Sequence, residues 1–156
     1  MNERTSSHAD VITLPPIVYL AGLLLGLLIH SFYPVRFLGE SVATWLGILL
    51  ILVSISIGLL ALLAFQRAGT SPHLHKPTTA IVTDGIYQLS RNPMYVSLAV
   101  FYLGLACWIN SLWILLLIVP VLMVVEWGII KREEQYLEQK FGDEYLRYKS
   151  QVRRWI

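Results

Sequence analysis

The sequence predicts an all-α integral membrane protein with four transmembrane helices, a helical hairpin and a C-terminal amphipathic helical tail. The chain has 156 residues, of which 56% are hydrophobic and 14% are charged, and its mean hydropathy is +0.61. That composition is too apolar for a soluble domain of this length. The apolar residues form runs long enough to cross a bilayer, and the charges gather between the runs and after the last one. We expect a single membrane domain over residues 1–156.

The first two spans are predicted at about 17–32 and 41–66. Pro15-Pro16 is a natural helix start, and the 26 residues 41–66 carry no charge. A signal peptide is the competing interpretation of the first span. It is disfavoured because few basic residues precede the apolar core and no small-x-small cleavage site follows it. Small residues in the second span either pack helix against helix or line a gap between helices. These residues are Gly47, Ser54, Ser56 and Gly58.

The connection between Arg67 and Asn92 is long and polar, and its glycine and prolines break helices. It contains His73 and His75 in a His-x-His spacing. Two histidines without a third ligand are a weak metal signal, so we expect no metal site.

A helical hairpin follows this connection. The 34 residues 92–125 carry no charge, and one helix from Asn92 to Ile130 would be ~58 Å long, nearly two bilayer thicknesses. Asn110-Ser111 falls near the middle and supplies turn residues. The sequence therefore predicts two arms at about 93–109 and 111–130, with a kink at Pro120 in the second arm.

The charges of the remaining segment predict its structure and the topology. Residues 131–156 hold seven of the twelve basic and five of the ten acidic residues, and apolar residues recur at three- or four-residue spacing. This pattern indicates an amphipathic helix, or two short helices split near Gly142. Lys and Arg are concentrated in 67–92 and 131–156. A multi-pass protein with four spans and both termini in the cytoplasm satisfies the positive-inside rule.

Polar residues of three segments are predicted to meet at the cytoplasmic end. The first segment reads Gly85-x-Tyr87-x-x-x-Arg91-Asn92-Pro93-x-Tyr95 at the membrane edge, where a polar ligand or a simple interfacial anchor would explain an arginine between aromatics. The second is Glu126, an ionisable group within the last span. The third is Glu133-Glu134, which follows one turn beyond the membrane. Glu126 and Glu133 are seven residues apart, so a regular helix places them on one face.

These segments resemble the signature of isoprenylcysteine carboxyl methyltransferase-like proteins, which belong with the phospholipid N-methyltransferases among small integral-membrane methyltransferases. The resemblance covers about residues 76–154, the expected cofactor-binding half. Asn92 stands where eukaryotic members have His, and the chain has fewer spans than those enzymes, so their substrate is not carried over. The matching positions are Gly85, Tyr87, Arg91, Asn92, Pro93, Tyr95, Glu133, Glu134, Leu137, Phe141, Gly142, Glu144, Tyr145, Tyr148, Val152 and Arg154.

The resemblance implies S-adenosylmethionine as cofactor, and the matching residue types suit its groups. An arginine pairs with its carboxylate, and glutamates accept from its ribose hydroxyls or its ammonium. Tyrosine rings stack on adenine or face the sulfonium, and an asparagine offers both a donor and an acceptor. The expected cofactor-binding residues are Tyr87, Arg91, Asn92, Pro93, Tyr95, Glu133 and Glu134.

The methyl acceptor is expected to be a lipid-like or otherwise apolar small molecule, not a soluble protein or a nucleic acid. It would arrive from the surrounding lipids, between the second span and the hairpin. A carboxylate or thiolate acceptor would be steered by Arg153 or Arg154, whereas an amine acceptor needs a base, for which Glu126 is the candidate within the membrane. The sequence leaves O-, S- and N-methylation open, as it does the oligomeric state.

Three other functions are weighed against methyl transfer. A four-span small-molecule transporter would use Glu126 as its proton or cation site. A nicotinamide-dependent membrane reductase would share a similar Arg-x-Pro-x-Tyr pattern, but such sterol reductases are much longer. A structural membrane protein with a degenerate site is disfavoured by the intact spacing of the signature.

Overall fold

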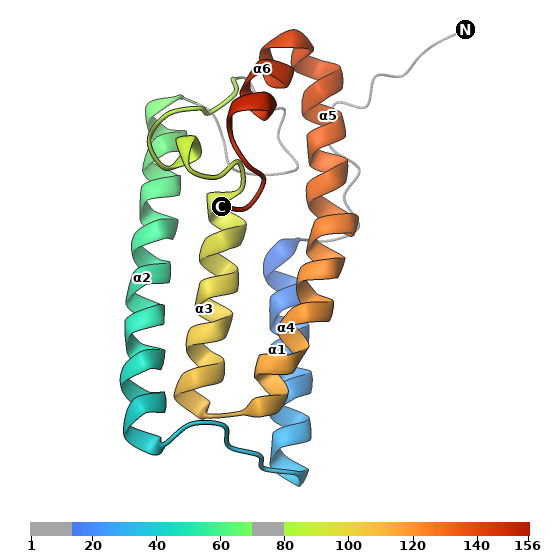
Figure 1. Ribbon diagram of the computed structural model, residues 1–156. Coiled ribbons are helices and arrows are strands. Elements are labelled where there is room, and N and C mark those ends of the chain that lie inside the picture. The colour runs from blue at the N-terminus through green and yellow to red at the C-terminus, as the bar shows by residue number, and fades with distance from the viewer. Residues whose placement is uncertain (1–13, 70–79) are drawn as a thin grey trace, which may run out of the picture.

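The structure is a computed structural model that describes residues 14–69 and 80–156, and all regular secondary structure within those ranges is helical. The helices form an elongated bundle, with the shorter elements gathered at one end (Figure 1). The elements are α1 (Pro15–Phe32), α2 (Glu40–Arg67), the 3-10 turn η1 (Gly85–Gln88), α3 (Pro93–Ile109), α4 (Leu112–Val125), the π-helical turn η2 (Glu126–Ile130), α5 (Lys131–Phe141) and α6 (Asp143–Gln151).

Three helical stretches in these ranges are long and apolar enough to cross a membrane, and α3 is a shorter apolar helix. Two of the three are α1 and α2, and the third is the continuous stretch Leu112–Phe141. The observed bounds lie within two residues of the predicted spans at 17–32, 41–66 and 93–109. Prolines at the first turns of α1 and α3 explain why those two starts were predictable from sequence.

A turn at Asn110-Ser111 joins α3 to α4, as the sequence predicts. Asn110 adopts the left-handed conformation with φ of 56°, and the Ser111 hydroxyl accepts a hydrogen bond from the backbone N–H of Ile114. The Asn110 side chain also binds the α1–α2 connection. Its Oδ1 accepts from the backbone N–H groups of Phe37 and Leu38 at 3.1 Å each, and its Nδ2 donates to the Leu38 carbonyl at 2.8 Å.

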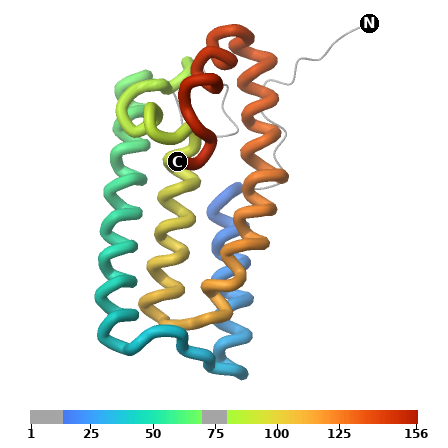
Figure 2. The backbone as a smooth tube through the Cα atoms, viewed as in Figure 1, coloured from blue at the N-terminus to red at the C-terminus, as the bar shows by residue number. Residues whose placement is uncertain are grey.

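Helices α2 and α3 lie side by side in direct contact (Figures 1 and 2). A Cβ atom added to Gly47 would lie 2.6 Å from the backbone nitrogen of Trp108, so the backbones approach at this point. The Ser97 hydroxyl donates a 2.9 Å hydrogen bond to the backbone carbonyl of Ser54. Two of the predicted small residues, Gly47 and Ser54, therefore pack helix against helix.

The last apolar helix does not end at residue 130. It continues from α4 through η2 into α5, 30 residues in all, which corresponds to ~45 Å. That length exceeds the ~30 Å of a hydrocarbon core, so part of this stretch extends beyond it. A π-helical turn interrupts the α-helical geometry of this stretch at 126–130. Pro120 lies inside α4, and the kink that we expected there stays a prediction.

Gly142 separates α5 from α6 with a φ of 53°, a conformation that glycine adopts without strain. The chain reverses there, and α6 lies beside η1, to which it is joined by a hydrogen bond from Tyr148 to the Tyr87 carbonyl (Figure 2). Tyr145 and Tyr148 on α6 are buried, so this helix packs on the protein and does not simply lie on the headgroups.

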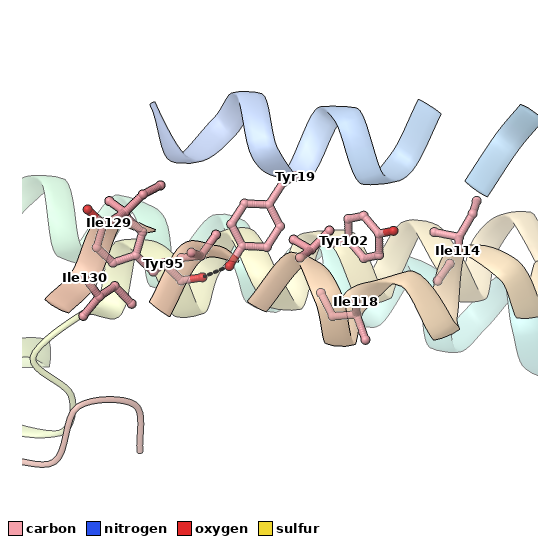
Figure 3. Close-up of a cluster of buried hydrophobic side chains, with 10 residues drawn as sticks. Tyr19, Tyr95, Tyr102, Ile114, Ile118, Ile129 and Ile130 are labelled. Atoms are coloured by element: carbon pink, nitrogen blue, oxygen red, sulfur yellow. Dashed lines mark hydrogen bonds between the residues drawn. The ribbon is translucent and has the colours of Figure 1, made fainter. Parts of the chain in front are cut away.

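The main hydrophobic core lies between α1, α3 and α4. Tyr19, Tyr102, Ile114 and Ile118 are buried in it, and it continues along the last helix to Ile129 and Ile130 (Figure 3). Within it, the Tyr19 hydroxyl donates to the backbone carbonyl of Tyr95 at 3.3 Å. This core fixes the first turn of α3 against α1, and that turn carries part of the candidate site.

Candidate functional site

A cavity of about 520 Å³ lies at the end of the bundle where α1 begins and α2 ends. Such a volume is typical of a small-molecule or cofactor site. One part of its wall is apolar and belongs to α1, α2 and α3, and another part is polar and aromatic. Its lining residues include Leu14, Pro15, Pro16, Gly58, Leu62, Phe65, Tyr87, Arg91, Asn92, Tyr95, Leu98, Glu133, Glu134, Tyr136, Tyr145 and Tyr148.

Arg91 is held between η1 and α3 by backbone contacts with the C-terminal segment, residues 152–156. Its backbone N–H donates to the Arg153 carbonyl at 3.0 Å. The Asn92 side chain and the Ser90 hydroxyl both donate to the Arg154 carbonyl, at 3.0 and 3.2 Å. Pro93 then starts α3. Part of the hydrogen-bonding capacity that we expected Asn92 to offer a ligand is therefore used to fix this segment.

The Arg91 side chain lines the cavity and is buried, with 8% of it exposed. Its Nη2 lies 3.1 Å from Oε1 of Glu134, whose side chain is 6% exposed. Its Nε and Nη1 are buried and have no hydrogen-bond partner among the described residues. Buried guanidinium donors are normally satisfied, so two open donors beside a cavity indicate a site for an anionic ligand.

The two neighbouring glutamates have different partners. Glu133 accepts a 2.7 Å hydrogen bond from the Tyr95 hydroxyl on the first turn of α3. Glu134 pairs with Arg91 and also with Arg154, which lies 2.7 Å away. The structure thus brings Arg91 together with Glu134 as the hairpin predicts, and it places Glu133 in the same cavity.

The three residues expected to act on the acceptor lie elsewhere. Arg154 binds Glu134 through Nε and Nη2, at 3.1 and 2.7 Å, and Glu126 through Nη1, at 2.8 Å. Hydrogen bonding to Glu134 raises the pKa of Arg154. Arg153 is exposed. None of these three belongs to the described lining of the cavity, and their direct action on an acceptor stays a prediction.

The π-helical turn explains why Glu126 and Glu133 do not share a helix face as expected. A π-helical turn holds one more residue than an α-helical turn, which rotates everything after it by roughly 100°. The turn begins at Glu126 and precedes Glu133. Glu133 consequently faces the cavity, whereas Glu126 faces Arg154 and Trp155.

Aromatic residues complete the wall, and four of them were not among the predicted site residues: Phe65, Tyr136, Tyr145 and Tyr148. Tyr145 and Tyr148 belong to α6 and line the cavity, with their rings 6.2 Å apart. Burial raises the pKa of the Tyr145 phenol, as does Glu134, while Arg91 lowers it. Burial likewise raises the pKa of Tyr148 and keeps its hydroxyl a donor. Both positions match the family signature and follow the three- or four-residue spacing of apolar residues in the tail. Either pattern could have identified them as site residues.

Phe65 on α2 also belongs to the wall, as does Gly58, one of the small residues that the sequence offered as possible lining of a gap. The Phe65 ring meets Tyr87 edge to face, with 5.5 Å between the ring centres. His73 and His75 lie outside the described residues. Within 14–69 and 80–156, no group of three or more His, Cys, Asp and Glu residues is gathered as a metal site requires.

Two comparisons with known proteins bear on the family of this chain. An uncharacterized protein of Haemophilus influenzae is 44% identical over 63 residues, which are 40% of this chain and the whole of that relative. The phospholipid methyltransferase family matches residues 42–144, which include most of α2, η1, the hairpin, α5 and the start of α6. Since this match covers more than half of the chain, the protein belongs to the phospholipid methyltransferase family.

Proposed function

We propose that this protein transfers a methyl group from S-adenosylmethionine to a lipophilic small-molecule acceptor at the cytoplasmic face of a membrane. The family indicates a methyltransferase. The single observation that carries the proposal is the buried Arg91 side chain, whose Nε and Nη1 lack partners in the described part of the chain and which lines a 520 Å³ cavity. A carboxylate is the group of the cofactor that would satisfy these donors.

The residues of the cavity fit the other groups of this cofactor as well. Glu133 has one oxygen bound by Tyr95, and its second oxygen can accept from a ribose hydroxyl or the ammonium group. Glu134 is less suitable for that role because Arg154 already donates to both of its oxygens. The aromatic rings of the wall offer faces for adenine and for the sulfonium cation.

When bound, S-adenosylmethionine supplies an activated methyl group, and the protein supplies position and a dry environment. Arg91 would bind the carboxylate of the cofactor, and Glu133 would accept a hydrogen bond from its ammonium group or a ribose hydroxyl. Tyr145 and Tyr148, which line the cavity from α6, would help to exclude water from the bound cofactor. Alignment of the sulfur, the methyl group and the acceptor would then provide most of the acceleration.

The acceptor would reach the cavity along its apolar wall. We expected access between the second span and the hairpin, and that route stays a prediction; away from the cavity, α2 and α3 are in close contact at Gly47. The apolar lining residues lie at the start of α1, in the second half of α2 and at the start of α3, among them Pro16, Leu62 and Leu98. A lipophilic acceptor that enters between α1 and α2 would meet the cofactor without crossing the polar end of the site.

The membrane topology is part of the proposal. Four spans, with α3 as the shortest, would place the cavity at the cytoplasmic end, where the Lys and Arg residues concentrate. A transporter with Glu126 as its ion site finds less support, because that carboxylate already pairs with Arg154.

Binding titrations of the detergent-purified protein test the proposal. We expect S-adenosylmethionine to bind and a reduced nicotinamide not to bind. The control variant Arg147→Gln should bind S-adenosylmethionine as the parent protein does, because Arg147 is exposed on α6 and does not belong to the described lining of the cavity. Binding of the nicotinamide in place of S-adenosylmethionine would favour a reductase and reject the methyltransferase assignment of the cavity.

A further inference from the structure

The Glu134 carboxylate lies between two arginines that have very different surroundings. Arg154 donates to both of its oxygens, at 3.1 Å from Nε and 2.7 Å from Nη2. Arg91 approaches the same carboxylate from the cavity side, with 3.1 Å between its Nη2 and Oε1 of Glu134. One buried negative charge is therefore shared by two positive charges, and the hydrogen bonds of Glu134 come from Arg154.

The two guanidinium groups differ in how many of their N–H donors are engaged by carboxylates. All three nitrogens of Arg154 are engaged, two with Glu134 and one with Glu126. Arg91 has an ion contact through Nη2, while its Nε and Nη1 find no partner in 14–69 and 80–156. Because Arg154 occupies the carboxylate, Glu134 does not capture the remaining donors of Arg91.

We propose that Arg154 is a positioning residue for the cofactor: by holding Glu134, it keeps the charge and the open donors of Arg91 available to the cofactor's carboxylate. This inference rests on the proposed function. Without the Arg154 side chain, Glu134 would form a one-to-one pair with Arg91. In a buried site such a pair cancels the positive charge and turns the donors of Arg91 toward Glu134.

The side chain and the backbone of Arg154 have separable roles. Its backbone carbonyl accepts from Ser90 and Asn92, the residues on either side of Arg91. A substitution of the side chain leaves that carbonyl in place, so it changes the charge beside Glu134 while keeping the backbone contacts. The variant Arg154→Gln therefore tests the side chain separately from the backbone, and it also removes the ion-pair partner of Glu126.

Two ligands and four variants test the proposal. The ligands are S-adenosylmethionine and decarboxylated S-adenosylmethionine, which lacks only the carboxylate. The variants are Arg154→Gln, Glu134→Gln, the double variant that combines them, and the control Arg147→Gln, which removes an exposed arginine of α6. Dissociation constants are measured on purified protein in detergent, and thermal unfolding verifies that each variant is folded.

We expect Arg154→Gln to weaken binding of S-adenosylmethionine by about tenfold or more, and to change binding of the decarboxylated ligand by less than about twofold. Removing the opposing charge in the double variant should restore most of the lost affinity. A loss that is equal for both ligands would indicate a merely structural role and overturn the proposal, as would a double variant no better than Arg154→Gln.

If Arg154→Gln does not fold, the variant Glu134→Gln tests the positioning role in its place. We expect this variant to bind S-adenosylmethionine at least as tightly as the parent, and a tenfold loss would overturn the proposal. The parent protein separates this inference from the proposed function. If the parent itself binds neither ligand, the cofactor assignment fails, whereas a parent that binds and an Arg154→Gln variant that binds equally well reject the positioning role alone.

Discussion

The hydroxyl of Tyr148 donates a 2.7 Å hydrogen bond to the backbone carbonyl of Tyr87, 61 residues earlier in the chain. This buried contact joins α6 to η1, and both residues line the cavity. The wall of the candidate site is therefore held together by the site's own tyrosines.

Replacing Tyr148 with Phe should loosen this wall. The change removes one buried hydrogen bond and leaves the Tyr87 carbonyl without its donor, which costs about 1–3 kcal/mol. We expect a lower unfolding temperature and weaker binding of S-adenosylmethionine. Tyr33→Phe is the matched control, since Tyr33 is 69% exposed. Equal effects of the two substitutions would contradict the prediction.

Replacing Arg91 with Ala should weaken binding of S-adenosylmethionine by about 1.5–3 kcal/mol, roughly 10- to 150-fold, because a charge-assisted hydrogen bond is lost. Calorimetry on the purified variant and the parent measures the difference. If Arg91 is only an interfacial anchor, the two dissociation constants will be equal and membrane insertion will change instead.

Glu133→Gln should also reduce cofactor affinity, by about 1–3 kcal/mol, because the amide is a poorer acceptor for an ammonium or ribose hydroxyl. Glu138→Gln on the same helix is the control, since Glu138 pairs with Lys149 and does not belong to the described cavity lining. The assignment of Glu133 would be lost if both variants bound S-adenosylmethionine as the parent does.

Gly47→Ala should separate α2 from α3. The added Cβ would lie 2.6 to 2.8 Å from Trp108, including two of its backbone atoms, so the helices must shift. Overpacking of this kind costs about 1–3 kcal/mol and lowers the unfolding temperature. Gly39→Ala adds the same methyl group where no atom lies within 4 Å, and we expect almost no change there.

Methyl transfer from labelled cofactor should place the label in a lipid extract and not in a water-soluble extract. The reason is the apolar part of the cavity wall at the start of α1 and in the second half of α2. Purified enzyme is incubated with each extract separately. Label found in soluble products alone would reject access from the bilayer and leave the methyltransferase assignment standing.

Much of the bundle was predictable because its boundaries are marked by single residues. Pro93 starts α3 and Asn110 ends it in a left-handed conformation, so the predicted and observed bounds agree. The meeting of Arg91 with Glu134 was also predictable, because a hairpin returns its two ends to one side.

Other features depend on contacts that a sequence pattern does not encode. The π-helical turn at 126–130 changes the helical phase without any change in composition, so the face of Glu126 was predicted wrongly. Arg153 and Arg154 are neighbours with the same charge, and their different surroundings arise only when the segment folds over the start of α3. The contribution of α1 to the cavity wall likewise depends on tertiary packing.

The three hydrogen bonds of the Asn110 side chain have a consequence for motion. They bind the α3–α4 turn to the α1–α2 connection, and the backbone N–H of Leu112 adds a 3.0 Å bond to the Val35 carbonyl. Both interhelical connections at that end are thus fastened to each other, while the cavity lies at the opposite end. We expect Asn110 to act as a hinge. During ligand exchange the helix ends around the cavity would move apart, while the helix ends near Asn110 keep their contacts.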